Sequence, residues 1–525
     1  MKQLTALLPL LALFATGHAQ KNPEKYAATI TATDLKKHLT IVAGADMQGR
    51  ETGTDGQKKA AGYIESTFKS LGLRSGNKES YQQVYPLVQD TIISSRLEIA
   101  GKGYSMGKDY MLSALTAGNK NITAQKVVFA GYGISDSLYD DYAGIDAKDA
   151  VVVLALGEPK QGNQNLLPAG GRTQSWSSIN RKMQAALAKG AAAIFVVSPR
   201  MATIDSVVAA NQRRSNLYPG GRQTNDADRV NVATISQVLF KDLFGNAYAD
   251  SVLKKFTDSE KFGAADYKSV SKPVAFDCQK NSVEKANSSN VLAVLEGTDK
   301  KDEYVFLTAH YDHLGLRNGT VFYGADDDGS GTVSVLEMAE AFAKAKAEGN
   351  GPRRTIVFMT VSGEEKGLWG SAYYGDHPLF PLEKTSVDLN TDMVGRLDPK
   401  RTYGDSTNYV YVIGDDKLSS DLKGISESVN KKYSKLELDY KYNDPKDPER
   451  IYFRSDHYNF ARKGVPILFY FNGTHADYHR PTDTVDKINF DVMEKRVRFI
   501  FHTAWEMANR NDMLKRDIPL PEMSR

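Results

Sequence analysis

The residues best suited to chemistry are carboxylates and histidines at the ends of predicted strands. The segment 324–331 reads GADDDGSG, with three adjacent aspartates between glycines. Neighbouring negative charges repel one another, so a plain turn rarely contains three of them unless cations offset the repulsion. The segment leads into a predicted helix that begins near Gly331. This acidic run therefore indicates a turn that lies against cations.

Four further strand ends carry side chains that can bind metal ions. Taken alone, a histidine or an acidic pair at a strand end is usually a solvated surface group. Five such coincidences at one edge of a sheet instead predict a shared metal site, because ligands bind beyond the carboxyl ends of the strands. Besides the aspartate run, these side chains are His310 with Asp312, Glu364 with Glu365, Asp392, and Tyr478 with His479.

These residue types fit zinc. Zinc binds neutral imidazole and carboxylate oxygen at about 2.0–2.2 Å, and catalytic sites leave one position open. Two metals about 3.5–4 Å apart need a ligand that reaches both, and a short carboxylate does so naturally. Asp327, in the middle of the triplet, is the predicted bridge. The flanking glycines would let the backbone turn tightly beside the metals.

The elements that must position these side chains alternate between strand and helix from residue 288 onward. Near-continuous apolar strands with helices between them predict a sheet covered on both faces. We therefore expect an α/β fold with a mixed, largely parallel sheet flanked by helices. The strand candidates are 290–297, 304–312, 355–363, 387–395, 409–414 and 465–473, and the helix candidates are 333–348, 418–433 and 490–510.

A length of 525 residues predicts more than one domain. Residues 35–73 carry two helical patterns, and around residue 120 the chain changes to β-rich runs at 126–134, 150–157 and 191–199. We expect a β-rich domain inserted within a catalytic domain. The predicted boundaries are 20–120 for the first part of the catalytic domain, 121–275 for the insertion and 276–525 for the second part.

The N-terminus is typical of a signal peptide. Lys2 precedes the apolar run LTALLPLLALFATG, and Gly17-His18-Ala19 forms a small-x-small cleavage signal. We expect residues 1–19 to be removed and the mature chain to be secreted or periplasmic. No second long apolar segment follows, so no membrane anchor is expected. Cys278 is the single cysteine and excludes an intrachain disulfide.

The charge balance excludes some classes of partner. The formal net charge is +3, from 67 basic and 64 acidic residues, and no patch or tail concentrates the excess. This argues against nucleic acid or an anionic membrane as the partner. The sequence does not indicate an oligomeric state.

Six motifs in a fixed order resemble a known enzyme family. HYDHLG, GADDDGSG, SGEEKGLWGS, NTDMVG, RSDHYNF and YHRPTDT look like the dizinc exopeptidases of metallopeptidase family twenty-eight, which includes secreted bacterial aminopeptidases. The segment from Gly49 to Ile64 resembles the N-terminal helix region of that family. The inserted block resembles a protease-associated domain through VVFAGYGI, YDDYAGIDAKDAVVVL and AAAIFVV.

The resemblance implies a site with two Zn²⁺ ions. His310, Asp327 and Asp392 would bind one zinc, and His479, Asp327 and Glu365 the other. A carboxylate that holds the far nitrogen of a zinc-bound histidine fixes its tautomer. Alternate strand residues project to one side, so the spacing from His310 to the next but one residue permits this arrangement.

The resemblance also implies the catalytic roles. Glu364 would be the general base that takes a proton from a water shared by the two zincs, and Asp312 would orient His310. The Tyr478 hydroxyl would stabilise the oxyanion, and Arg454 would help to hold the substrate. Asp392 would lie near the α-amino group, together with the general base.

The implied function is a secreted zinc-dependent aminopeptidase that acts on peptides with a free N-terminus. The alternatives are a dizinc carboxypeptidase or dipeptidase of the same fold, a single-zinc glutaminyl cyclase, and a non-catalytic receptor or binding module. A receptor would be expected to lose ligands, and this chain keeps them all. The remaining histidines are interpreted as structural, loop-shaping or positioning residues: His38, His313, His377, His457, His475 and His502.

Overall fold

The computed structural model of the chain describes residues 22–167, 175–198, 201–220, 230–444 and 446–521. Its contacts divide the chain into two compact units, residues 1–85 with 287–525, and residues 86–286. The predicted signal peptide, residues 1–19, lies outside the described residues. Among the residues that are described, no helix is long and apolar enough to cross a membrane.

The sheet of the first unit has a parallel centre, which confirms the predicted α/β fold with a mixed, largely parallel sheet. Four neighbouring strands run in the same direction. Antiparallel strands flank this centre, because the end of β14 pairs with β18, and β20 pairs with β22. The strands in spatial order are β14 (Val274–Leu295), β18 (Arg354–Val361), β15 (Lys300–His310), β19 (Thr385–Thr391), β22 (Ile467–Phe471), β20 (Tyr409–Ile413) and β21 (Glu437–Asp439).

The sheet is buried on both faces. Every residue of β18, β19 and β22 is buried, as expected for strands between two layers of helices. In β15, Val305, Leu307 and Ala309 belong to one hydrophobic cluster, whereas Phe306 belongs to another on the opposite face. Because successive strand residues point to opposite faces, β15 contributes side chains to the hydrophobic clusters on both faces of the sheet.

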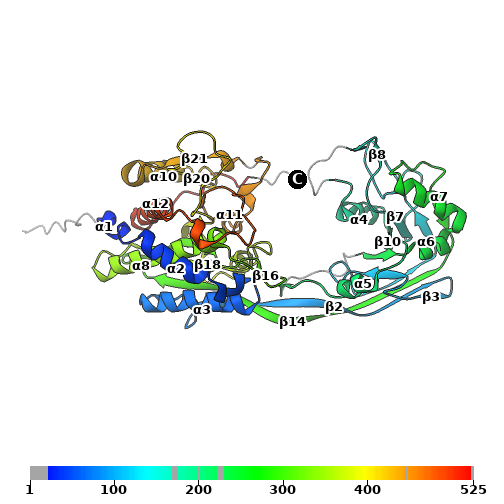
Figure 1. Cartoon of the computed structure of the whole chain (residues 1–525), viewed down its shortest axis with the longest axis horizontal. Helices are drawn as coiled ribbons and strands as arrows, with labels where there is room; N and C mark the ends of the chain where they lie inside the picture. The colour runs from blue at the N-terminus through cyan, green and yellow to red at the C-terminus, as the bar shows by residue number, and fades with distance from the viewer. Residues whose placement is uncertain (1–21, 168–174, 199–200, 221–229, 445, 522–525) are drawn as a thin grey trace, which may run out of the picture. The chain divides into compact units, whose positions relative to one another are not determined.

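Helices form these two covers, and the helix candidates of the sequence are confirmed. On one face α2, α3, α8 and α12 contribute to the cluster of Val305, and on the other α9 and α11 contribute to the cluster of Phe306. In Figure 1, α2 and α3 lie beside α8, which packs against β18. The helices of this unit are α1 (Pro23–Ala27), α2 (Ala32–Val42), α3 (Asp55–Ser70), α8 (Gly331–Ala347), α9 (Trp369–Asp376), α10 (Leu422–Val429), α11 (His457–Ala461) and α12 (Phe490–Asn509).

Local signals fix where these helices begin. The Thr31 hydroxyl accepts a hydrogen bond from the backbone N–H of Asp34 and caps α2, and Thr54 caps α3 in the same way. Asn489 caps α12. Such caps supply acceptors to N–H groups that have no partner within the helix.

The second unit has its own sheet of six strands and its own core. Its central strands β6, β7, β10 and β12 are parallel neighbours, and all five residues of β7 and of β10 are buried. The elements of this sheet and its helices are β4 (Tyr110–Leu112), β6 (Val127–Phe129), β7 (Val151–Ala155), α4 (Ile179–Ala188), β10 (Ala193–Val197), α5 (Ser206–Gln212), β12 (Asn231–Ile235), α6 (Gln237–Phe244), α7 (Asn246–Thr257) and β13 (Lys268–Val270).

The boundaries of the second unit differ from the predicted insertion at 121–275. The unit runs from Pro86 to Ala286. Two long strands, β2 (Gln82–Ile99) and β14, cross these boundaries without a break in secondary structure. Because a continuous strand offers no turn or change in composition at the boundary, the sequence gives no signal there. The resemblance of this unit to a protease-associated domain stays a prediction.

Candidate metal centre

Four parallel strands end at the same edge of the first sheet and bring the predicted side chains together. β15 ends at His310, and Glu364 and Glu365 follow β18. Asp392 is the first residue after β19, and the loop after β22 carries His479. We call these residues, together with Asp327, the strand-end cluster. The parallel pairing explains the convergence, because the carboxyl ends of parallel strands lie side by side.

One half of the cluster surrounds His310. Its Nε2 atom lies 3.4 Å from Asp327 Oδ1, 3.7 Å from Asp392 Oδ2 and 3.9 Å from Glu364 Oε2. One ligand atom each from His310, Asp327 and Asp392 lies within 4.8 Å of the others, and all three residues are buried. These are the three side chains that the family resemblance assigns to the first metal.

The other half surrounds His479. Its Nε2 atom lies 3.1 Å from Asp327 Oδ2 and 3.0 Å from Glu365 Oε2. The two oxygens of Asp327 therefore face different histidines, because Oδ1 faces His310. A carboxylate placed in this way has the geometry of the predicted bridge.

His313 is a member that the sequence interpretation assigned only to shaping a loop. Its Nδ1 atom lies 2.7 Å from Glu365 Oε1 and 3.9 Å from Asp327 Oδ2. One ligand atom each from His313, Asp327 and Glu365 lies within 4.8 Å of the others. The spacing of three residues after His310 was the available signal. It was missed because the intervening chain has left the strand.

The two outer aspartates of the triplet are structural. Asp326 Oδ1 accepts a hydrogen bond from the Gly395 N–H, and its Oδ2 atom lies 3.1 Å from His475 Nε2. Asp328 Oδ1 accepts from the N–H groups of Gly331 and Met393. These donors offset the charges of the outer aspartates, which leaves the middle carboxylate free to face the histidines.

Asp483, in the motif YHRPTDT, holds the triplet in place. Its Oδ2 atom accepts the backbone N–H groups of Asp326 at 3.0 Å and Asp327 at 3.1 Å. The side chain is fully buried. Sequence analysis gave it no role, because a contact between two loops 156 residues apart leaves no pattern in the sequence.

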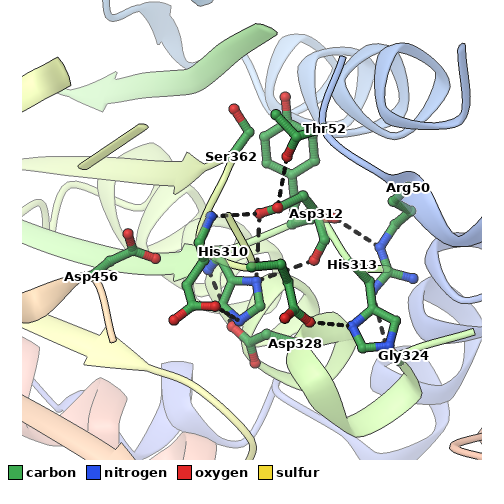
Figure 2. A network of polar contacts seen from close by, with 12 residues as sticks. Arg50, Thr52, His310, Asp312, His313, Gly324, Asp328, Ser362 and Asp456 are labelled. Atoms are coloured by element: carbon green, nitrogen blue, oxygen red, sulfur yellow. Dashed lines mark hydrogen bonds and ion pairs between the residues drawn. The ribbon is translucent and has the colours of Figure 1, made fainter. Parts of the chain in front are cut away.

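Buried Arg50 also fixes the backbone near the cluster. Its guanidinium donates to the carbonyl oxygens of Tyr311, Val42, Tyr323 and Gly324. Arg50 thereby ties the segment after β15 to the segment before the acidic triplet (Figure 2). The sequence interpretation included this residue in a motif but assigned it no role.

Asp312 lies beside His310, as the sequence analysis expected. Figure 2 shows its side chain between Thr52 and His310. The Thr52 hydroxyl donates to Asp312 Oδ2 at 2.7 Å, and the backbone N–H of Glu364 donates to Oδ1. His310 Nδ1 lies 3.2 Å from the Asp312 carbonyl oxygen and 3.7 Å from Oδ1. Both contacts leave Nε2 facing the other carboxylates.

Unpartnered buried atoms show that these residues fit a metal. His310 Nε2, Asp327 Oδ2 and His313 Nε2 are buried and have no hydrogen-bond partner, and His313 Nδ1 and Glu365 Oε1 are buried facing each other. Buried polar atoms are normally hydrogen-bonded, so such a concentration needs a compensating group. Imidazole nitrogen and carboxylate oxygen are the donor set that zinc prefers.

Charge and burial shift the pKa values at the cluster. Burial raises the pKa of Glu364 well above its ordinary value, although His310 partly lowers it. Burial alone would lower the pKa of His310, but the negative charges of Asp392 and Glu364 outweigh this and raise it. Asp327 is also buried, but the close approach of His310 and His479 holds its pKa well below the usual range.

A pocket opens beside the cluster. Its polar wall contains Asp327, Glu364 and Asp392, and Arg454 and Tyr478 also line it. Arg454 Nη2 donates to the Tyr478 hydroxyl oxygen at 3.1 Å. The remaining lining is largely apolar and comprises Met393, Ile451, Ser455, Phe469, Phe471 and Thr474.

Comparisons with known proteins fit this site. Residues 290–504 match the model of peptidase family M28. The chain is 28% identical to a probable leucine aminopeptidase of Arthroderma otae over 230 residues, which are 42% of this chain and 58% of the relative. It is 29% identical to leucine aminopeptidase 1 of Penicillium rubens over 227 residues, covering 42% of this chain and 56% of the relative.

A solved structure shares the fold over most of the chain. The aminopeptidase from Aneurinibacillus sp. strain AM-1 aligns with a TM-score of 0.51 and 18% identity, over 95% of this chain and 99% of the other. At this identity the likeness concerns the fold alone. The chain spans about half the length of the curated relatives that it matches.

Proposed function

We propose that the chain, whose residues 290–504 match the model of peptidase family M28, is a zinc aminopeptidase that hydrolyses the first peptide bond of substrates with a free N-terminus. The observation that carries this proposal is the strand-end cluster, with its buried ligand atoms that have no hydrogen-bond partner. The proposal includes two zinc ions that share Asp327. It also includes secretion after removal of residues 1–19.

The structure supports the following assignment of ligands. His310 and Asp392 would hold one zinc, and His479 and Glu365 the other, with Asp327 between them. Zinc bound here would lower the pKa of a water molecule and polarise the carbonyl of the scissile bond. His313 lies close to Glu365, so its imidazole would either orient that carboxylate or bind the zinc beside it.

Glu364 is the proposed general base. Its carboxylate lines the pocket next to Asp327 and Asp392. It takes a proton from the attacking water as the new C–O bond forms at the carbonyl carbon. It then passes this proton to the amine nitrogen as the C–N bond breaks. The carboxylate ends in its starting state, so the cycle can repeat.

Tyr478 is the proposed donor to the carbonyl oxygen. Burial and the negative charge of Asp327 raise the pKa of Tyr478, so the phenol keeps its proton. Arg454 donates to the phenol oxygen, which leaves the phenol hydrogen available to the substrate. A donor aimed at an oxygen that gains negative charge lowers the barrier to reaction.

The lining of the pocket supports an amine-binding site. Glu364 and Asp392 line it, and their carboxylate oxygens can accept hydrogen bonds from the positive α-amino group of a peptide N-terminus. A carboxypeptidase would require this surface to hold a substrate carboxylate. The apolar side of the pocket, with Ile451, Phe469 and Phe471, fits an apolar first side chain.

The test is a panel of nitroanilide substrates, assayed alongside zinc content. We expect hydrolysis of free aminoacyl-nitroanilides, with leucine or phenylalanine preferred over aspartate, and no hydrolysis of the N-acetylated compounds. Purified active protein should contain zinc. Hydrolysis of N-blocked peptides from their C-terminus would instead establish the carboxypeptidase alternative.

A further inference from the structure

A second group of potential metal ligands lies on the helices that cover the sheet. It consists of His38 on α2 with Glu337 and Glu340 on α8, and we call it the helix cluster. One ligand atom from each residue lies within 4.8 Å of the others. The two glutamates stand three residues apart on one helix, so both side chains can face α2.

The interior side of the helix cluster lacks a partner. Glu337 is only 2% exposed, and its Oε1 atom has no hydrogen-bond partner. This oxygen faces His38 Nε2 at 3.5 Å, a distance too long for a normal hydrogen bond. A buried carboxylate oxygen that lacks a donor is costly unless the group is protonated or a cation lies beside it, so the arrangement leaves a place for a positively charged group.

Nearby charges do not compensate Glu337. Burial, with smaller contributions from the negative charges of Glu340 and Asp34, raises its pKa to about 8, and Lys37 offsets this only in part. Burial and Lys37 lower the pKa of His38. The imidazole is therefore neutral near pH 7, which is the form that binds metal ions.

Tyr63 on α3 fixes the orientation of His38. The Tyr63 hydroxyl lies 2.7 Å from His38 Nδ1. This contact occupies one ring nitrogen and leaves Nε2 facing Glu337. Histidines that bind metals usually have their second nitrogen held in this way.

From this geometry we propose that His38, Glu337 and Glu340 bind a zinc ion in addition to any ions of the strand-end cluster. One imidazole nitrogen and two carboxylate oxygens suit zinc. Glu340 is exposed, so the ion can enter from solvent and water can complete its coordination. The ion would link α2 to α8, the helix that begins three residues after Asp328.

Zinc stoichiometry of the full chain tests the proposal. The protein and its variants are dialysed against a chelator-buffered Zn²⁺ solution, and bound zinc is measured by atomic emission. Glu340→Gln changes an exposed side chain and should leave the fold intact. We expect Glu340→Gln and His38→Asn each to bind one zinc per chain less than the wild type. Equal zinc content in all three proteins would overturn the proposal.

Two further variants sharpen this test. Glu348→Gln removes an exposed carboxylate from the end of the same helix, where it pairs with Lys25, and should retain the wild-type zinc content. Tyr63→Phe should retain the additional ion but bind it at least about tenfold more weakly, because its hydroxyl orients the ligand. Unchanged affinity in Tyr63→Phe would contradict this arrangement of His38.

A turnover measurement distinguishes the helix cluster from the strand-end cluster. At saturating zinc, Glu340→Gln should hydrolyse free aminoacyl-nitroanilides at the wild-type rate while it lacks one ion. Loss of turnover together with that ion would place the missing metal in the strand-end cluster and overturn the proposal. The zinc difference between variants does not depend on whether the strand-end cluster is catalytic.

Discussion

Two acidic runs, one in each unit, solve the same physical problem in different ways. Asp326 to Asp328 lie in the first unit, and Asp140 with Asp141 lie in the second. Each run contains a fully or almost fully buried aspartate, Asp327 or Asp141. A buried carboxylate requires hydrogen-bond donors, a cation or a proton.

Protein donors surround Asp141. Its Oδ2 atom accepts the backbone N–H groups of Tyr132 and Ile134, both at 3.0 Å. Its Oδ1 atom accepts the hydroxyls of Tyr139 and Tyr267. These four donors saturate both oxygens, so Asp141 joins neighbouring loops of the second unit and leaves no oxygen for a ligand.

Asp327 has no comparable set of donors. Its Oδ2 atom is buried without a hydrogen bond, and its nearest neighbours are histidines and other carboxylates. The comparison teaches that burial of an acid alone does not identify a metal site. The informative observation is which donors remain missing after the protein has folded.

The largest effect is expected from removal of the Asp327 carboxylate. Asp327→Ala should lose both proposed zincs together, because it removes the oxygen donor common to the two sites. Loss of metal catalysis is worth several kcal/mol, so turnover should fall about 10⁴-fold. Zinc content and kcat are measured on the same sample.

Asp140→Asn, a partly exposed change in the other acidic run, is the control and should keep both zinc and activity. An Asp327→Ala protein that retains one full equivalent of zinc at the strand-end cluster would contradict the bridging role.

The next largest effect distinguishes a general base from a metal ligand within the strand-end cluster. Glu364→Gln should lower kcat by about 10²- to 10⁴-fold, since it removes the proposed general base. Its zinc content should stay near that of the wild type. A parallel loss of zinc and activity would instead make Glu364 a metal ligand.

Strand periodicity made most of the metal centre predictable. His310, Glu364 and Asp392 stand at the ends of apolar runs, and parallel pairing then brings strand ends together. Glycines on both sides marked the aspartate triplet. The sheet could be derived for the same reason, because near-continuous apolar runs of strand length indicate burial on both faces.

The supporting contacts could not be derived, because they join loops that carry no repeating pattern. Arg50 binds four carbonyl oxygens, and Asp483 binds two backbone N–H groups. A backbone partner has no sequence signature. The second unit shows the same limit, since strand β2 crosses its boundary without interruption.

A smaller effect is expected at Asp141, whose carboxylate oxygens are both hydrogen-bonded. Asp141→Asn keeps the size of the side chain but places an amide N–H₂ group against hydrogen-bond donors. Leaving buried donors without an acceptor should lower the free energy of unfolding by about 1–3 kcal/mol. Urea denaturation followed by fluorescence measures this change.

The same variant sharpens the contrast between the runs. Its zinc content should equal that of the wild type, since all four donors to Asp141 come from the second unit. A loss of zinc from correctly folded Asp141→Asn would show that the two acidic runs are not independent.

The last prediction concerns a third kind of compensation, a proton. Asp388 in β19 is fully buried, and its Oδ2 atom has no hydrogen-bond partner, whereas Oδ1 lies 2.7 Å from the Thr308 hydroxyl. Burial raises its pKa to about 8. The folded protein therefore keeps Asp388 protonated and neutral near pH 7.

The sign of the pH dependence follows from this raised pKa. Protonation of Asp388 stabilises the fold fully below the unfolded pKa of about 3.9, and this contribution is lost as the pH rises toward 8. Asp388→Asn cannot titrate. The unfolding free energy of the wild type should therefore fall relative to the variant by about 1.4 kcal/mol per pH unit between pH 5 and 7.

Urea denaturation of both proteins at several pH values measures this slope, and the difference should level off above pH 8. A difference that does not change with pH would mean that Asp388 is ionised in the fold. It would then need a cation or donors, as Asp327 and Asp141 do. The proton would then no longer count as a third way in which this chain compensates a buried aspartate.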